Sequence, residues 1–213
     1  DVSSEKESQI ETKMVNKQLA YIVDHDELTG IYNQSGFFNA TEKLLKENPE
    51  KEYSLICSNV EDFKVINDLY GVEYGDGVLC SMAEYCLKVS NGIGTCGRLG
   101  NDHFAVCAPR EAYYMDMLER VAIMKFNIHG IDIPLVCNFG IYNIFERDIP
   151  INIMCDRANI ALQTIRKKYK KNCVVFKDEM RQKILYNQKI TSEAVDAIKN
   201  EEGYLNPFDY QNL

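Results

Sequence analysis

Two groups of polar residues lie where the chain is predicted to turn at the ends of strands. Ser58-Asn59-Val60-Glu61-Asp62 follows directly on Tyr53–Cys57, an apolar run with the length of a buried strand. Gly100-Asn101-Asp102-His103 lies at the tip of a predicted hairpin, with Gly100-Asn101 as its tight turn. If the strands are neighbours, carboxylate and amide oxygens at their ends can hold Mg²⁺ and, through it, phosphates. Turns are polar in most proteins, so spacing alone leaves that simpler interpretation open.

Composition limits the classes of protein to consider. The chain has 213 residues, is 46% hydrophobic and carries a net charge of −8, which argues against a broad nucleic-acid-binding surface. Its eight cysteines lie mostly in apolar runs and never in a CxxC pair, which predicts reduced packing residues in a cytoplasmic protein. No apolar stretch approaches the roughly 20 residues that a membrane span needs.

The periodicity of apolar residues predicts an α+β protein with helices packed on a mixed sheet. Residues 1–24 form an amphipathic helix or linker, 25–177 the main domain and 178–213 a helical connector. Strands are expected at Tyr53–Cys57, Thr95–Leu99, His103–Ala108, within Ile133–Phe145 and at Cys173–Phe176. Helices are expected at Gln34–Glu47, within Asp62–Ser90, and at Glu111–Phe126, Ile151–Lys168 and Asp178–Asn200.

Four segments in order resemble the motifs of GGDEF domains. They are Asp26–Asn33 (DELTGIYN), Asn59–Asp68 (NVEDFKVIND), Tyr70–Asp76 (YGVEYGD) and Arg98–Phe104 (RLGNDHF). The resemblance covers about residues 25–177 and implies the nucleotide-cyclase-like fold, a ferredoxin-like βαββαβ core with a mixed β-sheet flanked by helices. It also implies the family's reaction, in which a homodimer joins two molecules of GTP into cyclic di-GMP.

The resemblance assigns the GTP-binding residues. Asn67 and Asp76 stand where the family contacts guanine, and an amide with a carboxylate can read the donors and acceptors of that base. Lys64 stands near the phosphates, and Gly100 is the first glycine of the signature. Three of these positions have a simpler interpretation. Asn67 and Asp76 could cap a helix or loop, and Lys64 could be a solvated surface lysine.

The metal and catalytic positions depart from the family pattern. Asn59 replaces the aspartate that binds metal, while the backbone carbonyl of Val60 and the carboxylate of Asp102 remain. His103 replaces a glutamate and offers a nitrogen, which suits transition metals better than Mg²⁺. Asn101 replaces the second glycine but tolerates a positive φ, so the turn should survive. The Mg²⁺ site is therefore expected to be weakened and turnover to fall by orders of magnitude, with less effect on guanine binding.

Two further family positions are altered. The product-binding RxxD motif falls at Asn91–Gly94, which reads NGIG, so feedback through that motif is absent. The lysine that would contact phosphate aligns with Gln163. Lys167 lies four residues later on the same predicted helical face and could substitute, but the pattern of the basic run 166–171 favours a solvated helix end.

Three functions follow from these observations. The chain could be a GTP-binding regulatory domain without catalysis, a weakly active diguanylate cyclase, or a scaffold that dimerises through residues 1–24 without binding nucleotide. Ile190–Glu202 resembles the connector that precedes an EAL phosphodiesterase domain, so the chain is expected to come from a longer signalling protein.

Overall fold

The computed structural model describes residues 21–90, 92–110, 118, 122–165 and 172–202. The chain divides into two compact units, residues 1–176 and 177–213, and each is described by itself. Of the helix predicted at 1–24, only Tyr21–Asp24 lie among the described residues, and these four are helical. No helix among the residues described is long and apolar enough to cross a membrane.

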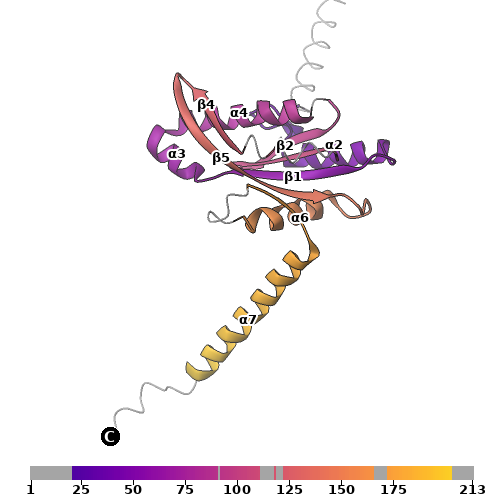
Figure 1. The fold of residues 1–213 in the computed structure, drawn as a ribbon, viewed down its shortest axis with the longest axis vertical. Helices are drawn as coiled ribbons and strands as arrows, with labels where there is room; N and C mark the ends of the chain where they lie inside the picture. The colour runs from indigo at the N-terminus through magenta and orange to yellow at the C-terminus, as the bar shows by residue number, and fades with distance from the viewer. Residues whose placement is uncertain (1–20, 91, 111–117, 119–121, 166–171, 203–213) are drawn as a thin grey trace, which may run out of the picture. The chain divides into compact units, whose positions relative to one another are not determined.

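The first unit contains one sheet and the helices that cover it (Figure 1). In chain order the elements are α2 (Gln34–Glu47), β1 (Tyr53–Val60), α3 (Phe63–Tyr70), α4 (Val72–Ser90), β2 (Thr95–Gly100), β3 (His103–Pro109), β4 (Ile123–Ile128), β5 (Ile131–Asn143), α6 (Ile151–Gln163) and β6 (Cys173–Val175). The second unit contains α7 (Asp178–Glu202).

Strand β1 lies at the centre of the sheet and pairs antiparallel with both β3 and β5. The strand order is β2-β3-β1-β5-β4, and β6 pairs in parallel with β5. Strands β2, β3, β1 and β5 have the order expected of a βαββαβ ferredoxin-like core. The predicted α+β fold with a mixed sheet and flanking helices is confirmed.

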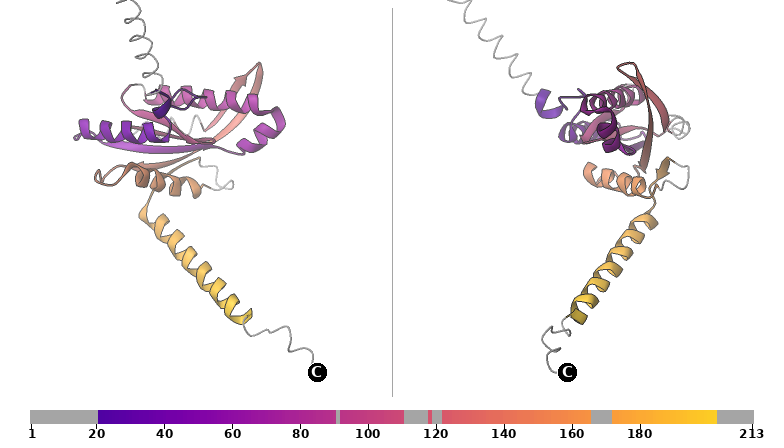
Figure 2. Two further views of the ribbon diagram at one scale, coloured as in Figure 1. Left: turned by 180° about the vertical axis from the view of Figure 1, so that it is seen from behind. Right: turned by 90° about the vertical axis from the view of Figure 1, so that its left-hand side faces the viewer.

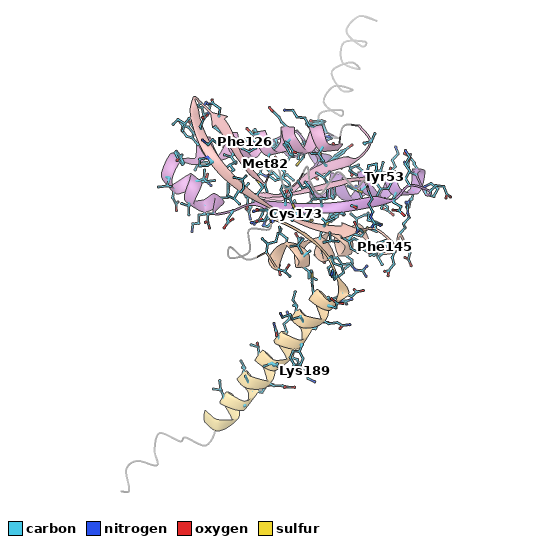
Figure 3. All side chains as sticks on the ribbon, in the orientation of Figure 1. Tyr53, Met82, Phe126, Phe145, Cys173 and Lys189 are labelled. Carbon is cyan, nitrogen blue, oxygen red and sulfur yellow. The ribbon has the colours of Figure 1, made fainter. Side chains whose placement is uncertain are left out.

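Alternation of side chains along β1 builds two hydrophobic layers, one on each face of the sheet. Ile56 and Val60 belong to the layer under α4, whereas Leu55 and Cys57 belong to the layer that includes α2 and α6. Figure 1 and the reverse view in Figure 2 show α4 and α6 on opposite sides of β1. Figure 3 labels Met82 of α4, which belongs to the first layer, and Phe126 of β4, which is partly buried and packs against that layer.

Helix α2 has the predicted bounds because its ends are marked by local chemistry. The Asn33 side chain accepts a hydrogen bond from the Gly36 N–H at 2.9 Å, which satisfies one of the donors left free at a helix start. Asn48 ends the helix before Pro49, since the residue before proline disfavours helical geometry.

Two helices were predicted to extend further along the chain than the structure shows. Ile123–Phe126 were expected at the end of a helix but form β4, which pairs with β5 from Ile123 opposite Val136 to Ile128 opposite Ile131. The turn between these strands uses positive φ at His129 and Gly130, so pairing in a tight β-hairpin overrides the helical pattern. Helix α6 ends at Gln163 instead of Lys168, and 166–168 lie outside the described residues.

The cysteines are packing residues, as predicted. None of the eight forms a disulfide, and all except Cys80 are buried. Burial raises the pKa of Cys137 to about 12, so its thiol is neutral at physiological pH. Cys86, Cys96 and Cys137 lie in the layer under α4, and Cys57, Cys107 and Cys155 in the other.

Close packing of α6 on β5 depends on Gly140. A Cβ at this position would lie 2.0 Å from the Ala158 carbonyl oxygen and 2.6 Å from the Leu162 nitrogen. Because backbone atoms cannot move aside cheaply, we expect Gly140→Ala to lower the free energy of unfolding by about 3 kcal/mol.

Urea denaturation measures this loss, with Gly92→Ala as the control. Gly92 has a φ of +72°, and a Cβ added there would meet no other atom within 4 Å. Only backbone strain remains in that variant, which costs about 1 kcal/mol. Equal losses in the two variants would contradict the packing argument.

Candidate functional site

The register of the sheet brings three polar side chains to one face at the end of β1. Asn59 points to the same face as Leu55 and Cys57, because side chains two residues apart share a face. Asn138 of β5 lies opposite Asn59 in the ladder. His103 starts β3 two residues before Ala105, which belongs to the same layer as Leu55 and Cys57.

Helix α6 covers this face and completes a cleft of about 600 Å³. Polar residues from the sheet and the helix line it: Asn59, His103, Asn138, Asp156, Asn159 and Gln163. The Asn138 amide oxygen accepts a hydrogen bond at 3.1 Å from the amide of Asn172, which immediately precedes β6. Most of these polar side chains are therefore uncharged amides, and Asp156 contributes a carboxylate.

The signature hairpin is tied to the end of β1 by one hydrogen bond. The Val60 N–H donates to Asp102 Oδ2 at 3.1 Å. The turn residues are Asn101 and Asp102, one residue later than predicted, because Gly100 still pairs with His103 after an irregularity in the β2–β3 ladder. Asn101 has a φ of +46°, so asparagine does sustain the turn, as expected.

Arg98 links this hairpin to the segment that follows the N-terminal helix. Its guanidinium contacts both carboxylate oxygens of Asp26 at 3.1 and 3.2 Å, and its Nε donates to the Asn101 carbonyl at 2.8 Å. The Asp26 carboxylate also accepts from the backbone N–H and the hydroxyl of Thr29 at 2.9 and 2.6 Å. Arg98 and Asp26 therefore hold the signature turn from outside the cleft.

The charge of Asp26 is set by opposing effects. Burial on its own raises the pKa of Asp26, but the hydrogen bonds from Thr29 and the pairing with Arg98 outweigh it. The pKa of this carboxyl therefore lies below its usual value, and the ion pair persists at neutral pH.

Few oxygen ligands for a divalent cation lie at the end of β1 among the described residues. Asn59 Oδ1 is fully buried and has no hydrogen-bond partner among the residues described. A cation would satisfy it, and Asp102 can offer Oδ1 because Oδ2 faces Val60. These groups carry a single negative charge, and the described residues contain no group of three or more His, Cys, Asp and Glu side chains that could hold a metal.

A second polar group lies between α3 and α4. Asn67 of α3 packs against Gly75 so closely that a Cβ there would lie 1.8 Å from Asn67 Oδ1. Asp76 follows Gly75 directly on α4, so the two residues predicted to bind guanine come from packed, adjacent elements. Asn67 Oδ1 is buried without a partner in the described part of the chain, which leaves the amide nitrogen to face outward.

The structure thus gathers Asn59, Val60, Asp102 and His103 at one strand end, and Asn67 and Asp76 on the helices after β1. Lys64 is an exposed side chain in the first turn of α3, and Gly100 ends β2 with a φ of +130°. Their assignment to GTP stays a prediction.

Sequence reasoning did not single out Asn138 or the role of Arg98. A lone Asn within the apolar strand Leu135–Ile141 was the available signal for the first residue. The only signal for the role of Arg98 was its charge, which is opposite to that of Asp26 in a separate motif.

Comparison with known proteins identifies the family. The model of the family "Diguanylate cyclase, GGDEF domain" matches residues 23–172, and the chain belongs to this family. It is 32% identical over 127 residues to diguanylate cyclase DgcM of Escherichia coli K12, covering 57% of this chain and 31% of that protein. It is 22% identical over 198 residues to the cyclic di-GMP phosphodiesterase PdeR of the same organism, covering 90% of this chain and 30% of PdeR. The chain thus spans less than a third of the length of these relatives.

Solved structures share the fold. The coiled coil and GGDEF domain of DgcB from Caulobacter crescentus, in complex with c-di-GMP, superposes with a TM-score of 0.70 at 19% identity. The match covers 82% of this chain and 96% of that one. The active GGEEF domain of a diguanylate cyclase from Vibrio cholerae gives a TM-score of 0.59 at 19% identity, over 68% and 97% of the two chains.

The Asp26–Arg98 pair makes a pH-dependent contribution to stability. We expect Asp26→Asn to lower the free energy of unfolding by about 2 kcal/mol at neutral pH, because it removes the charge-assisted hydrogen bonds from Arg98. A carboxylate with a lowered pKa stabilises the fold above its unfolded pKa of about 3.9 and loses that effect as the pH falls through its lower folded pKa.

Urea denaturation at neutral pH and at about pH 3 tests this, since the difference between wild type and Asp26→Asn should shrink in acid. Glu27→Gln changes the exposed neighbouring carboxylate and serves as the control. A difference that is the same at both pH values would show that the charge of Asp26 does not matter.

Proposed function

We propose that this GGDEF domain binds guanine nucleotides and regulates an attached domain, without itself producing cyclic di-GMP. The observation that carries this proposal is the chemistry at the end of β1. Asn59, which faces the cleft, is an amide, and His103 follows Asp102 in the signature hairpin. Phosphoryl transfer requires neutralisation of the charge that develops on phosphate, and carboxylates provide it by holding metal ions. Compared with the family pattern, this site retains the carboxylate of Asp102 and has groups without negative charge at Asn59 and His103.

The metal would be held by Asn59 Oδ1 and Asp102, with water completing its coordination. Bound Mg²⁺ supplies Lewis-acid neutralisation of phosphate oxygens, which is worth several kcal/mol in phosphoryl transfer. Asp102 is positioned by the Val60 N–H, so its carboxylate is fixed in place. With two carboxylates missing, turnover should be slower by about three orders of magnitude or more.

Guanine binding rests on different residues. The outward-facing amide of Asn67 can donate to the O6 edge of guanine, and the carboxylate of Asp76 can accept from its N1 and N2 hydrogens. Both side chains are only partly exposed and sit on packed helices, which limits the ordering cost of binding. The changes at Asn59 and His103 leave this base-reading pair intact.

A weakly active diguanylate cyclase is the second candidate. The retained hairpin turn and the hydrogen bond between Val60 and Asp102 favour it, because they preserve the shape of the strand end. Catalysis would then require a homodimer, with one GTP on each protomer. Incubation with GTP and Mg²⁺, then Mn²⁺, separates the candidates. Cyclic di-GMP formed in proportion to enzyme would establish the cyclase, and its absence from folded protein would support the silent domain.

The regulated domain that we propose is an EAL-type phosphodiesterase following α7 in a cytoplasmic signalling protein. The alignment with the phosphodiesterase PdeR, which extends over most of this chain, supports that choice. The resemblance of Ile190–Glu202 to the connector before EAL domains supports it as well.

Restoring the missing carboxylates should restore catalysis. We expect Asn59→Asp combined with His103→Glu to raise cyclic di-GMP synthesis by at least about a hundredfold, since metal neutralisation contributes several kcal/mol. Product chromatography measures the gain, and Asn59→Ser with His103→Gln is the uncharged control. A double variant that binds GTP but makes no more product than wild type would place the defect elsewhere.

Removing the base-reading side chains should weaken binding. We expect Asn67→Ala to raise the Kd for GTP about tenfold and Asp76→Ala about thirtyfold, because the second loses hydrogen bonds to a charged acceptor. Isothermal titration calorimetry measures both, and Glu84→Ala on the exposed face of α4 is the control. If neither variant changes the Kd for GTP, Asn67 and Asp76 do not contact guanine.

A further inference from the structure

The strand register fixes the place of Asn138 in the cleft under α6. Asn138 lies opposite Asn59 in the β1–β5 ladder, so the two side chains project from the same face of the sheet. Gly140, two residues later on that face, packs on the backbone of α6, so this is the face of β5 that α6 covers. Asn59 and Asn138 therefore line the cleft from neighbouring positions on adjacent strands.

The amide of Asn138 is oriented by Asn172. The Phe139 N–H donates to the Asn172 carbonyl at 2.7 Å, so the backbone of Asn172 is tied to β5. From this position the Asn172 side-chain amide donates to Asn138 Oδ1 at 3.1 Å. Because Oδ1 is engaged with Asn172, the other end of the Asn138 amide, Nδ2 with its two N–H groups, is left for a ligand. Within the described part of the chain, Nδ2 donates to no other group.

The two amides on this face offer complementary chemistry to a ligand. Asn59 Oδ1 is a buried acceptor without a partner among the residues described, which suits a cation. Asn138 Nδ2 is a donor, which suits an anionic oxygen. A phosphate group bound to a cation at Asn59 would present such oxygens, because phosphate oxygens carry negative charge and accept hydrogen bonds.

We infer that Asn138 donates a hydrogen bond to a phosphate group of the bound nucleotide, and that Asn172 positions it to do so. This inference rests on the proposed binding of a guanine nucleotide, with the base at Asn67 and Asp76. It adds a phosphate-binding residue from β5 that the family motifs in the sequence do not contain. Removing the Asn138 amide then weakens binding of the nucleotide and leaves binding of the nucleoside unchanged, because guanosine has no phosphate.

Calorimetry on the full chain in Mg²⁺ tests the inference, with GTP and guanosine as the two probes. We expect Asn138→Ala to raise the Kd for GTP about tenfold, through loss of one hydrogen bond to a charged acceptor, and to leave the Kd for guanosine unchanged. Asn143→Ala is the matched control. Asn143 lies on the same strand and its amide oxygen accepts from the Ser54 hydroxyl at 2.9 Å, but it is not among the described residues that line the cleft.

Comparison of the two probes separates a phosphate contact from a structural role. Equal weakening of GTP and guanosine by Asn138→Ala would show that the variant disturbs the whole site, and would overturn the inference. An unchanged Kd for GTP, with guanosine still bound, would overturn the inference while leaving the proposed guanine binding in place. If neither probe binds the wild-type protein, the proposed function fails and the inference fails with it.

A double-mutant cycle tests the positioning role of Asn172. We expect Asn172→Ala to raise the Kd for GTP about threefold, because the Asn138 amide is then free to turn, and to add no further loss to Asn138→Ala. Asn172→Ala leaves the described lining of the cleft in place, so it also tests the inference if Asn138→Ala does not fold. An unchanged Kd for GTP in Asn172→Ala, or losses that add in the double variant, would overturn the positioning of Asn138 by Asn172.

Discussion

The register of β1 between β3 and β5 is the constraint on which both the core and the site depend. Each residue of β1 has a fixed partner in the sheet, from Tyr53 opposite Pro109 to Val60 opposite Cys137. A slip of one residue would move Leu55 and Cys57 out of their layer and would turn Asn59 away from α6. Burial of apolar side chains on both faces therefore fixes the polar strand end at the same time.

The two parts of the candidate site, one on α3 and α4 and one at the end of β1, differ in how far they depend on charge. The residues that we propose to read guanine, Asn67 and Asp76, depend on hydrogen-bond geometry, and packing of Asn67 on Gly75 holds one of them in place. A metal site at the strand end would depend on negative charge, and an amide has nearly the shape of a carboxylate without that charge. A domain of this family can therefore lose catalysis and keep its structure, because catalysis depends on the charge of the side chain at position 59 and packing depends on its shape.

Local chemistry predicted the fold better than it predicted the site. The bounds of α2 follow from Asn33 and Pro49. The apolar run Tyr53–Cys57 predicted the start of the central strand but not its end, because β1 continues to Val60. Strand β4 was missed because 123–126 continue an apolar pattern that suits either state, and only pairing with β5 decides between them. The hairpin turn was placed one residue early because Gly100 was counted in it, although glycine here remains paired with His103.

Candidate metal and guanine residues could be named from ordered motifs, but the cleft could not. Asn138 reaches it through strand register, and Asp156, Asn159 and Gln163 through the packing of α6 on the sheet. These residues lie 79 to 104 positions away from Asn59 along the chain, as the difference between their numbers gives. A sequence pattern carries no information on which face of a sheet a distant helix will cover.

The seven buried thiols make local opening of the hydrophobic layers measurable by chemical labelling. Cysteines lie in both hydrophobic layers, and a thiol that is sealed in the core reacts with an alkylating reagent only when the surrounding layer opens. Cys80, which is partly exposed, supplies the reference rate in the same molecule. Mass spectrometry after a short labelling pulse would therefore tell whether the layer under α4 and the layer under α6 loosen together or separately.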